Sequence, residues 1–187
     1  MTNQTQVPET LNKKIDWESL SKTTLEMRRD IIKMLGIAGS GHPGGSLSIT
    51  DILALLYFHF LRHDAKNPKW PDRDRLIFSK GHGCPALYSA LAHAGYFDKK
   101  LLLTLRQLGS PLQGHPDVRR LAGIEASTGS LGQGLSVAIG CALAAKLGAK
   151  WDYSGDAEVF NEIKDQLLKI EQEVKNEVEA ADAALKG

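Results

Sequence analysis

The chain has 187 residues, enough for one domain of ordinary size. Hydrophobic residues make up 42% and charged residues 24%, a composition that excludes intrinsic disorder as the default state. The formal net charge is +1, without the basic excess typical of dedicated nucleic-acid binders, so we expect no nucleic-acid partner.

Membrane insertion and secretion are not expected either. The longest apolar stretch, Ile52 to Leu61, is interrupted by His59 and is too short to span a bilayer. The first eight residues are polar and lack the apolar segment of a secretory signal. Two cysteines, Cys84 and Cys141, are too few for a disulfide framework and have no metal-ligand spacing. A cytoplasmic protein is therefore the expectation.

The N-terminal third is predicted to be helical after a polar lead-in at residues 1–15. Asp16 is a suitable N-cap for a helix over residues 17–35, which the glycines that follow should end. A glycine- and serine-rich loop then precedes a second helix over residues 48–61, which is apolar nearly all round and is expected to be buried. The apolar stripe expected on the first helix consists of Leu20, Leu25, Ile31, Ile32 and Leu35.

The middle of the chain alternates short apolar runs with helical patterns. Residues 76–78 are predicted to form a strand that enters a glycine turn, and residues 123–127 a second short strand. Such alternation predicts an α/β fold with a parallel sheet. The helices expected around these strands cover residues 85–94, 99–108 and about 134–146, and residues 114–117 form a turn.

The C-terminal segment differs in composition from the rest of the chain. From Asp156 to Gly187 there are nine acidic residues and four lysines, and Glu158 to Leu185 contains neither glycine nor proline. Apolar residues recur there every three or four positions, which predicts one long amphipathic helix. The predicted organisation is thus a lead-in at 1–15, a domain at 16–150, and a linker with an amphipathic helix at 151–187.

Three histidines share one kind of setting. His42, His82 and His115 each follow a glycine in a predicted loop. Glycine allows backbone amides to approach an anion, and imidazole can donate a hydrogen bond or move a proton near neutral pH. Each Gly-His pair alone is also consistent with an ordinary tight turn, but three in one chain favour a site for an anionic ligand. The remaining histidines, and the thiol of Cys84, are expected to be structural.

A fourth loop opens the last helix of the predicted domain. Gly129, Gly132 and Gly134 invite comparison with a dinucleotide-binding fingerprint. The order of the glycines does not match that fingerprint, and no acidic residue ends a following strand, so this interpretation is rejected.

Four loop motifs together carry a family resemblance. Residues 39–46 read Gly-Ser-Gly-His-Pro-Gly-Gly-Ser, with Asp51 after them, and residues 79–83 read Ser-Lys-Gly-His-Gly. Gly-His-Pro follows at 114–116, and Thr-Gly-Ser-Leu-Gly-Gln-Gly at 128–134. Over about residues 10 to 150 the chain resembles the N-terminal thiamine-diphosphate-binding domain of transketolase, most closely the separate N-terminal subunit of the two-chain type. The resemblance implies a thiamine-diphosphate-binding-type α/β fold, here incomplete and rich in helix.

The resemblance also implies chemistry. Thiamine diphosphate and Mg²⁺ would be the cofactors, and the reaction would be transfer of a two-carbon ketol unit between sugar phosphates of the pentose phosphate pathway. By match to the family's motifs, His42 and His82 would lie near the diphosphate and the reacting carbons, and His115 would contact substrate hydroxyls. Gly129 and Leu131 would pack against the cofactor. A C-terminal transketolase subunit would be the partner.

The metal site is where the sequence departs from the family. The family pattern has an apolar strand ending in Gly-Asp-Gly-Glu, whereas residues 149–154 are short and polar. Gly-Asp-Ala-Glu at 155–158 resembles a remnant, which makes Asp156 the candidate metal ligand. Asp156 also suits the N-cap of the C-terminal helix, and we favour that interpretation.

These departures lead to a hypothesis about the whole chain. We expect a truncated transketolase N-terminal section, inactive alone, whose core is covered by an unrelated, engineered or foreign helix. The same helix would also suit self-association as a coiled-coil strand. The alternative functions are a non-catalytic scaffold or assembly module built on a transketolase fragment and, less favoured, a nucleotide or sugar-phosphate binder.

Overall fold

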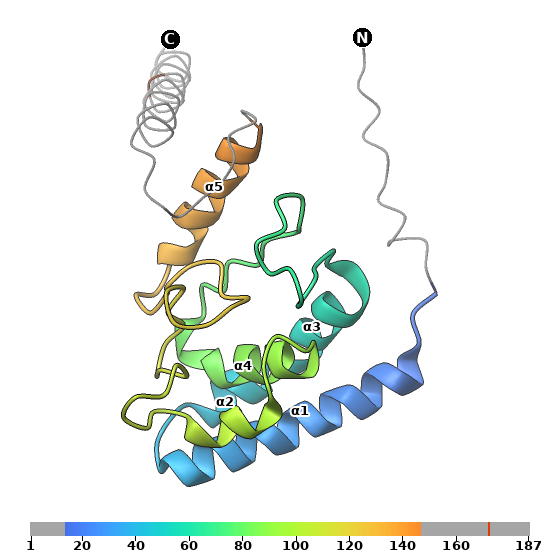
Figure 1. Cartoon of the computed structure of the whole chain (residues 1–187), viewed down its shortest axis with the longest axis vertical. Coiled ribbons are helices and arrows are strands. Elements are labelled where there is room, and N and C mark those ends of the chain that lie inside the picture. Colours follow the sequence, from blue (N-terminus) through green and yellow to red (C-terminus); the bar gives the residue numbers. More distant parts are fainter. Residues whose placement is uncertain (1–13, 147–171, 173–187) are drawn as a thin grey trace, which may run out of the picture. The chain divides into compact units, whose positions relative to one another are not determined.

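The computed structural model describes residues 14–146 and residue 172 (Figure 1). The chain divides into two compact units, Met1–Val137 and Ala138–Gly187, and helix α5 (Gln133–Lys146) crosses their boundary. The predicted site residues that the structure describes all belong to the first unit. The predicted C-terminal helix and Asp156 lie outside the described residues. Within the described ranges, no helix has the length and apolar character needed to cross a bilayer.

Helix α1 (Trp17–Ala38) begins where the sequence predicts. The side chain of Asp16 accepts a hydrogen bond from the backbone amide of Ser19 at 3.0 Å, which satisfies one of the free amides of the first turn. The helix continues three residues beyond the predicted end at Leu35. It ends at Gly39, whose left-handed φ of 62° is accessible to glycine at little cost.

The buried face of α1 differs in part from the predicted stripe. Ile31 is fully buried as expected, but Leu25 and Ile32 are 49% and 53% exposed. Leu25 and Ile32 each lie one position beyond the line of the helical repeat that faces the core, so their side chains point to solvent. The residues that line the buried face are Thr24, Met27, Ile31 and Met34.

The second predicted helix is divided into two pieces. Its predicted range, 48–61, is occupied by α3 (Thr50–Leu55) and a π-helical turn, η2 (Leu56–Phe60), while a short helix α2 (Pro43–Leu47) precedes it. Ile52 is 57% exposed and Phe58 39% exposed, so the prediction of burial all round is wrong. The buried residues Leu53 and Ala54 lie four and three positions before the buried Tyr57, so they form one face with it, and the opposite face is exposed.

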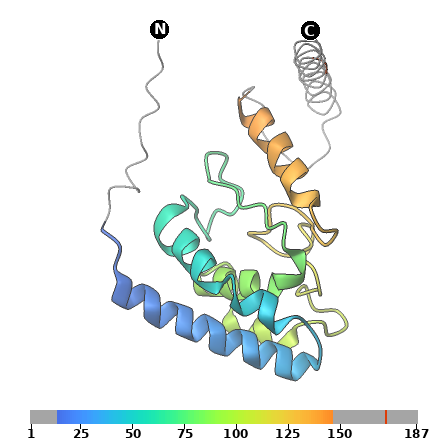
Figure 2. The same ribbon diagram turned by 180° about the vertical axis from the view of Figure 1, so that it is seen from behind.

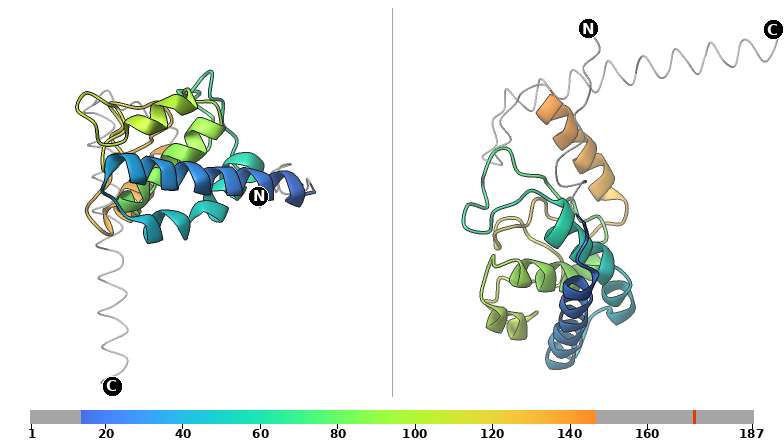
Figure 3. Two further views of the ribbon diagram at one scale, coloured as in Figure 1. Left: turned by 90° about the horizontal axis from the view of Figure 1, so that it is seen from below. Right: turned by 90° about the vertical axis from the view of Figure 1, so that its right-hand side faces the viewer.

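Helix α4 (Cys84–His93) is the centre of the first unit. Every residue from Cys84 to Ala92 is buried. Helices α1, α2 and α3 and the 3₁₀ helix η4 (Lys99–Thr104) all pack against it (Figure 2). Seen from below, α1 passes along both α3 and α4 (Figure 3). A helix apolar on every side is stable only inside such a layer of other elements.

The helix predicted at residues 99–108 is shorter than expected. Only η4 forms, because the backbone of Leu105 (φ −49°, ψ 126°) is not helical and Arg106 has a positive φ of 62°. The turn predicted at residues 114–117 lies in a loop, as expected.

The two predicted strands are not formed among the described residues, so that part of the prediction is wrong for this structure. Residues 76–78 and 123–127 lack a neighbouring strand in the described ranges, and a strand requires a backbone ladder. The carbonyl of Phe78 instead accepts a hydrogen bond from the Thr128 hydroxyl at 2.7 Å. The two segments are thereby joined through a side chain rather than through paired backbones.

The central position of α4 yields a stability prediction. Leu91 is fully buried, so Leu91→Ala should lower the free energy of unfolding by about 2–5 kcal/mol through lost burial and the cavity left behind. Leu108→Ala is the matched control, because Leu108 is fully exposed and its truncation should change stability little. Urea denaturation followed by circular dichroism measures both, and equal effects would contradict the placement of α4.

Candidate functional site

The three histidines singled out by the sequence lie together. The ring centroids of His42 and His82 are 5.1 Å apart, and those of His82 and His115 are 4.7 Å apart, both in edge-to-face geometry. His42 is the N-cap residue of α2, and His82 lies in the 3₁₀ turn η3 (Gly81–Gly83) that leads into α4. His115 comes from the loop after η4. Three loops far apart in the sequence therefore present imidazoles to one place, which we call the histidine cluster.

Glycines allow these loops to approach one another. A Cβ added to Gly81 would lie only 2.8 Å from the backbone nitrogen of Gly129 and 2.9 Å from its Cα. A Cβ on Gly129 would lie 3.2 Å from Cδ2 of His115. Gly129, predicted to contact a cofactor, is thus beside the histidine cluster. The two loops therefore meet backbone to backbone at Gly81 and Gly129, a contact that a side chain at Gly81 would prevent.

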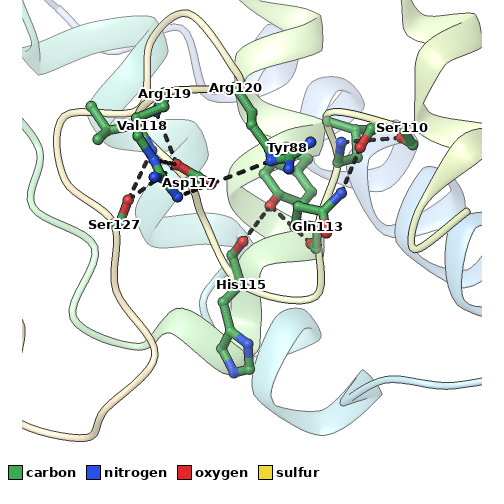
Figure 4. A network of polar contacts seen from close by, with 10 residues as sticks. Tyr88, Ser110, Gln113, His115, Asp117, Val118, Arg119, Arg120 and Ser127 are labelled. Atoms are coloured by element: carbon green, nitrogen blue, oxygen red, sulfur yellow. Dashed lines mark hydrogen bonds and ion pairs between the residues drawn. The ribbon is translucent and has the colours of Figure 1, made fainter. Parts of the chain in front are cut away.

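Buried hydroxyl and thiol groups hold the backbone that carries His115. The Tyr88 hydroxyl lies 2.9 Å from the carbonyl oxygen of Gln113 and 3.1 Å from that of His115 (Figure 4). The Cys84 thiol donates to the carbonyl of Gly114 at 3.1 Å. Burial raises the pKa of Cys84 to about 12 and raises the pKa of Tyr88, so both stay protonated and keep donating at neutral pH.

The charge state of His115 follows from its neighbours. Partial desolvation lowers the pKa of His115, and electrostatic interactions with His82, Arg106 and His42 lower it further. His115 is therefore neutral at pH 7, with one ring nitrogen able to donate and the other able to accept. His82 has a ring nitrogen that is available to a ligand, because its buried Nδ1 has no hydrogen-bond partner among the described residues.

Two cations beside the cluster were missed at the level of sequence. Lys80 belongs to the Ser79–Gly83 motif, yet no role was expected for it; its Nζ donates to the Ser48 hydroxyl at 2.9 Å. Arg106 lies outside every motif, and its Nη1 donates to the Ser40 hydroxyl at 3.1 Å. Both side chains tie the loop around His42 to another loop of the site. The motif containing Lys80 was a usable signal, whereas nothing in the sequence marks Arg106.

An open depression adjoins His115 on the side of Asp117. The side chain of Asp117 binds Arg119 at 3.1 Å and Arg120 at 3.4 Å. Hydrogen bonds from the Arg119 side chain and backbone lower the pKa of Asp117 to about 2, so the carboxylate is ionised at neutral pH (Figure 4). The residues lining the depression are Gln113, Gly114, His115, Pro116, Asp117, Arg119, Arg120 and Ser127.

The other predicted site residues, Leu131 and Asp156, are not part of the histidine cluster as the structure describes it. Leu131 is 78% exposed, so it packs against little of the protein itself. Asp156, the candidate metal ligand, is outside the described residues. Within the described ranges, no three His, Cys, Asp or Glu side chains have an arrangement suited to a metal ion.

The other structural residues behave as expected. His93 Nε2 lies 2.8 Å from the Asp30 carboxylate, and His63 Nε2 lies 2.8 Å from the Tyr57 carbonyl. Cys84 is buried. His93 and His63 support packing and take no part in the histidine cluster, whereas the Cys84 thiol supports the backbone before His115.

Glycine-rich loops and convergent imidazoles at loops preceding helices are typical of domains that bind an anionic cofactor or substrate. Comparison with known proteins makes the class specific. Residues 22–167 match the family described as transketolase, thiamine diphosphate binding domain, so the chain belongs to that family. It corresponds to the N-terminal, thiamine-diphosphate-binding section of transketolase.

Individual relatives agree with this assignment. The chain is 54% identical over 121 residues to the 6-deoxy-6-sulfo-D-fructose transketolase subunit SqwG of Clostridium sp. (strain MSTE9), covering 65% of this chain and 44% of that protein. It is 42% identical over 147 residues to transketolase of Mus musculus, covering 76% of this chain and 23% of that protein. The chain therefore spans less than half the length of these relatives.

Solved structures extend the comparison to the fold. Transketolase from Campylobacter jejuni aligns with a TM-score of 0.65 and 42% identity, covering 71% of this chain and 21% of that one. Transketolase from Leishmania mexicana aligns with a TM-score of 0.65 and 36% identity, covering 67% and 19%. These similarities support the expected thiamine-diphosphate-binding type of α/β fold, although the described residues contain no strand.

The glycine contacts yield a prediction for the site. Gly81→Ala should push apart the loops that carry His82 and Gly129, because its Cβ would meet backbone, and should cost about 1–3 kcal/mol. Gly44→Ala is the matched control: it lies in α2 with no atom within 4 Å of the new Cβ, and should leave stability equal or slightly higher. Thermal unfolding of both variants tests this, and an unperturbed Gly81→Ala protein would contradict the close approach.

The environment of Cys84 yields a second prediction. With a pKa near 12, Cys84 carries very little thiolate at pH 8, so alkylation by iodoacetamide should be at least about a hundredfold slower than in the unfolded chain. A Cys141→Ser variant isolates the signal of Cys84, and mass spectrometry measures the rate. The same variant in guanidinium chloride is the control; equal native and unfolded rates would show that Cys84 is accessible.

Proposed function

We propose that this chain supplies the diphosphate-facing part of a thiamine-diphosphate-dependent enzyme that transfers two-carbon ketol units between sugar phosphates. One observation carries the proposal: His42, His82 and His115, placed by separate loops, meet beside the close contact of Gly81 and Gly129. That arrangement occurs in a chain of the transketolase thiamine-diphosphate-binding family.

The residues present fit the cofactor. The unpartnered, buried Nδ1 of His82 offers a hydrogen-bonding position, and it belongs to the turn whose Gly81 lies against the backbone of Gly129. Gly129 and the exposed Leu131 would contact the cofactor, and His82 would do so from the opposite loop. When bound, thiamine diphosphate supplies the carbanion chemistry of ketol transfer.

The chain's own residues would orient the substrate and handle protons. His42 and His82 would donate to substrate oxygens on which negative charge develops, an interaction that stabilises the transition state. His115 would bind substrate hydroxyls, and its lowered pKa keeps the ring neutral, so that it both donates and accepts at pH 7. Tyr88 and Cys84 would hold the His115 loop in place while these contacts form.

The remaining parts of the enzyme would come from elsewhere. A metal ion would be Mg²⁺, with Asp156 as the candidate ligand, and no described donor set supports a step through it. We propose that the chain is inactive alone, that it works in the cytoplasm, and that a C-terminal transketolase subunit completes the site. The name of the Clostridium relative, a subunit of a sulfo-sugar transketolase, supports a two-chain arrangement. The C-terminal segment would serve packing or self-association.

Calorimetry tests cofactor binding. Titration with thiamine diphosphate in the presence of Mg²⁺ should give binding heat, and His82→Ala should weaken the affinity by about tenfold through loss of one ligand hydrogen bond. His59→Ala is the control, because His59 packs against Phe60 outside the cluster, and its affinity should match the unsubstituted chain.

A second measurement separates enzyme from scaffold. A ketol-transfer assay with a C-terminal transketolase subunit added should give turnover that neither chain gives alone. Absence of heat at millimolar cofactor, with circular dichroism showing a folded protein, would refute the cofactor-binding function and leave the non-catalytic scaffold as the better account.

A further inference from the structure

Arg106 occupies an unusual backbone position. Its φ is 62°, and it is the one residue other than glycine with positive φ in the described part of the chain. The left-handed region is unfavourable for a residue with a Cβ and is populated readily by glycine. The position is held in this geometry because the Arg106 amide donates to the carbonyl of Leu112 at 2.9 Å, which closes the loop after η4.

The side chain of Arg106 connects two loops of the histidine cluster. Its Nη1 donates to the Ser40 hydroxyl at 3.1 Å, two residues before His42. Its guanidinium also lies against Gly114, where an added Cβ would come within 3.1 Å of Nε and 3.2 Å of Nη2. Gly114 precedes His115 directly. One guanidinium therefore contacts the segments that carry two of the three histidines.

Among residues 14–146, no carboxylate neutralises the charge of Arg106. No ion pair involving Arg106 is present among the described residues. By contrast, the nearby Arg119 and Arg120 are paired with Asp117. Arginine is less favourable than glycine at a positive φ, and its guanidinium contacts two loops of the candidate site. The contacts of the side chain, rather than the backbone geometry, therefore indicate the role of this residue.

We propose that Arg106 is a positioning residue that holds the Ser40–His42 and Gly114–His115 segments together, so that His42 and His115 face the same ligand. The inference rests on the proposed function for the identity of that ligand. It concerns the free chain, however, so the contact is tested without cofactor or substrate.

Hydrogen exchange and histidine titration test the contact. Arg106→Gln should raise amide exchange in residues 40–46 and 113–116 by about tenfold, the effect of losing one charged hydrogen bond. It should also raise the pKa of His115, measured by NMR, since a cation that disfavours the imidazolium is lost. The titratable and charged groups around His115 are His82, Arg106 and His42 from other loops and Asp117, Arg119 and Arg120 on its own loop.

Two variants perturb the same contact in different ways. Arg106→Lys keeps the charge and should keep most of the effect on the pKa of His115 while losing the planar contact with Gly114. Gly114→Ala keeps Arg106 but displaces its guanidinium, so it should raise exchange in both segments. Arg120→Gln is the matched control: it removes an equal charge that does not contribute to the lowered pKa of His115, and it should change neither readout.

Arg106→Gly separates positioning from a purely structural role. Glycine relieves the left-handed backbone, so the variant should remain folded while both readouts move as in Arg106→Gln. Unchanged exchange and an unchanged pKa of His115 in Arg106→Gly and Arg106→Gln would overturn the proposal. Absence of cofactor binding by the unsubstituted chain would instead refute the proposed function, while the positioning role of Arg106 in the free chain would still hold.

Discussion

Burial of helix α4 on every side is the constraint on which the first unit depends. From Cys84 to Ala92 the helix has no exposed face, so its polar groups need partners inside the protein. The Ser89 hydroxyl donates to the Met27 carbonyl of α1 at 3.4 Å. The Tyr88 hydroxyl and the Cys84 thiol donate to backbone carbonyls of the loop before Pro116. The same burial that stabilises the core therefore positions the loop of His115.

The histidine cluster is an extension of that core. His82 lies in the turn that begins α4, so the packing of α4 against α1, α2 and α3 determines where this ring stands. The site is completed by the backbone contact of Gly81 with Gly129, which only glycine permits, and by the close approach of Arg106 to Gly114. Stability and binding geometry are thus coupled, because a change in the packing of α4 displaces a ring of the candidate site.

Much of the site was predictable from the sequence, but less of the fold was. The Gly-His pairs and the glycine loop at 128–134 are local signals of residues suited to an anionic ligand. The start of α1 at Asp16 was also predictable, because capping is a local interaction. The strands at 76–78 and 123–127 were not, since an apolar run becomes a strand only with a partner to pair with. The division of the second helix by a π-helical turn left no mark in the pattern.

By itself, the sequence determined the residue types of the loops, the beginning of the first helix and the family to which the chain belongs. These depend on short-range chemistry and on motifs read along the chain. Only the tertiary structure decided that His42, His82 and His115 meet, that Tyr88 and Cys84 hold the third loop, and that Arg106 bridges two of the loops. Such contacts join residues distant in the sequence, and they arise from packing around α4, which no local pattern encodes.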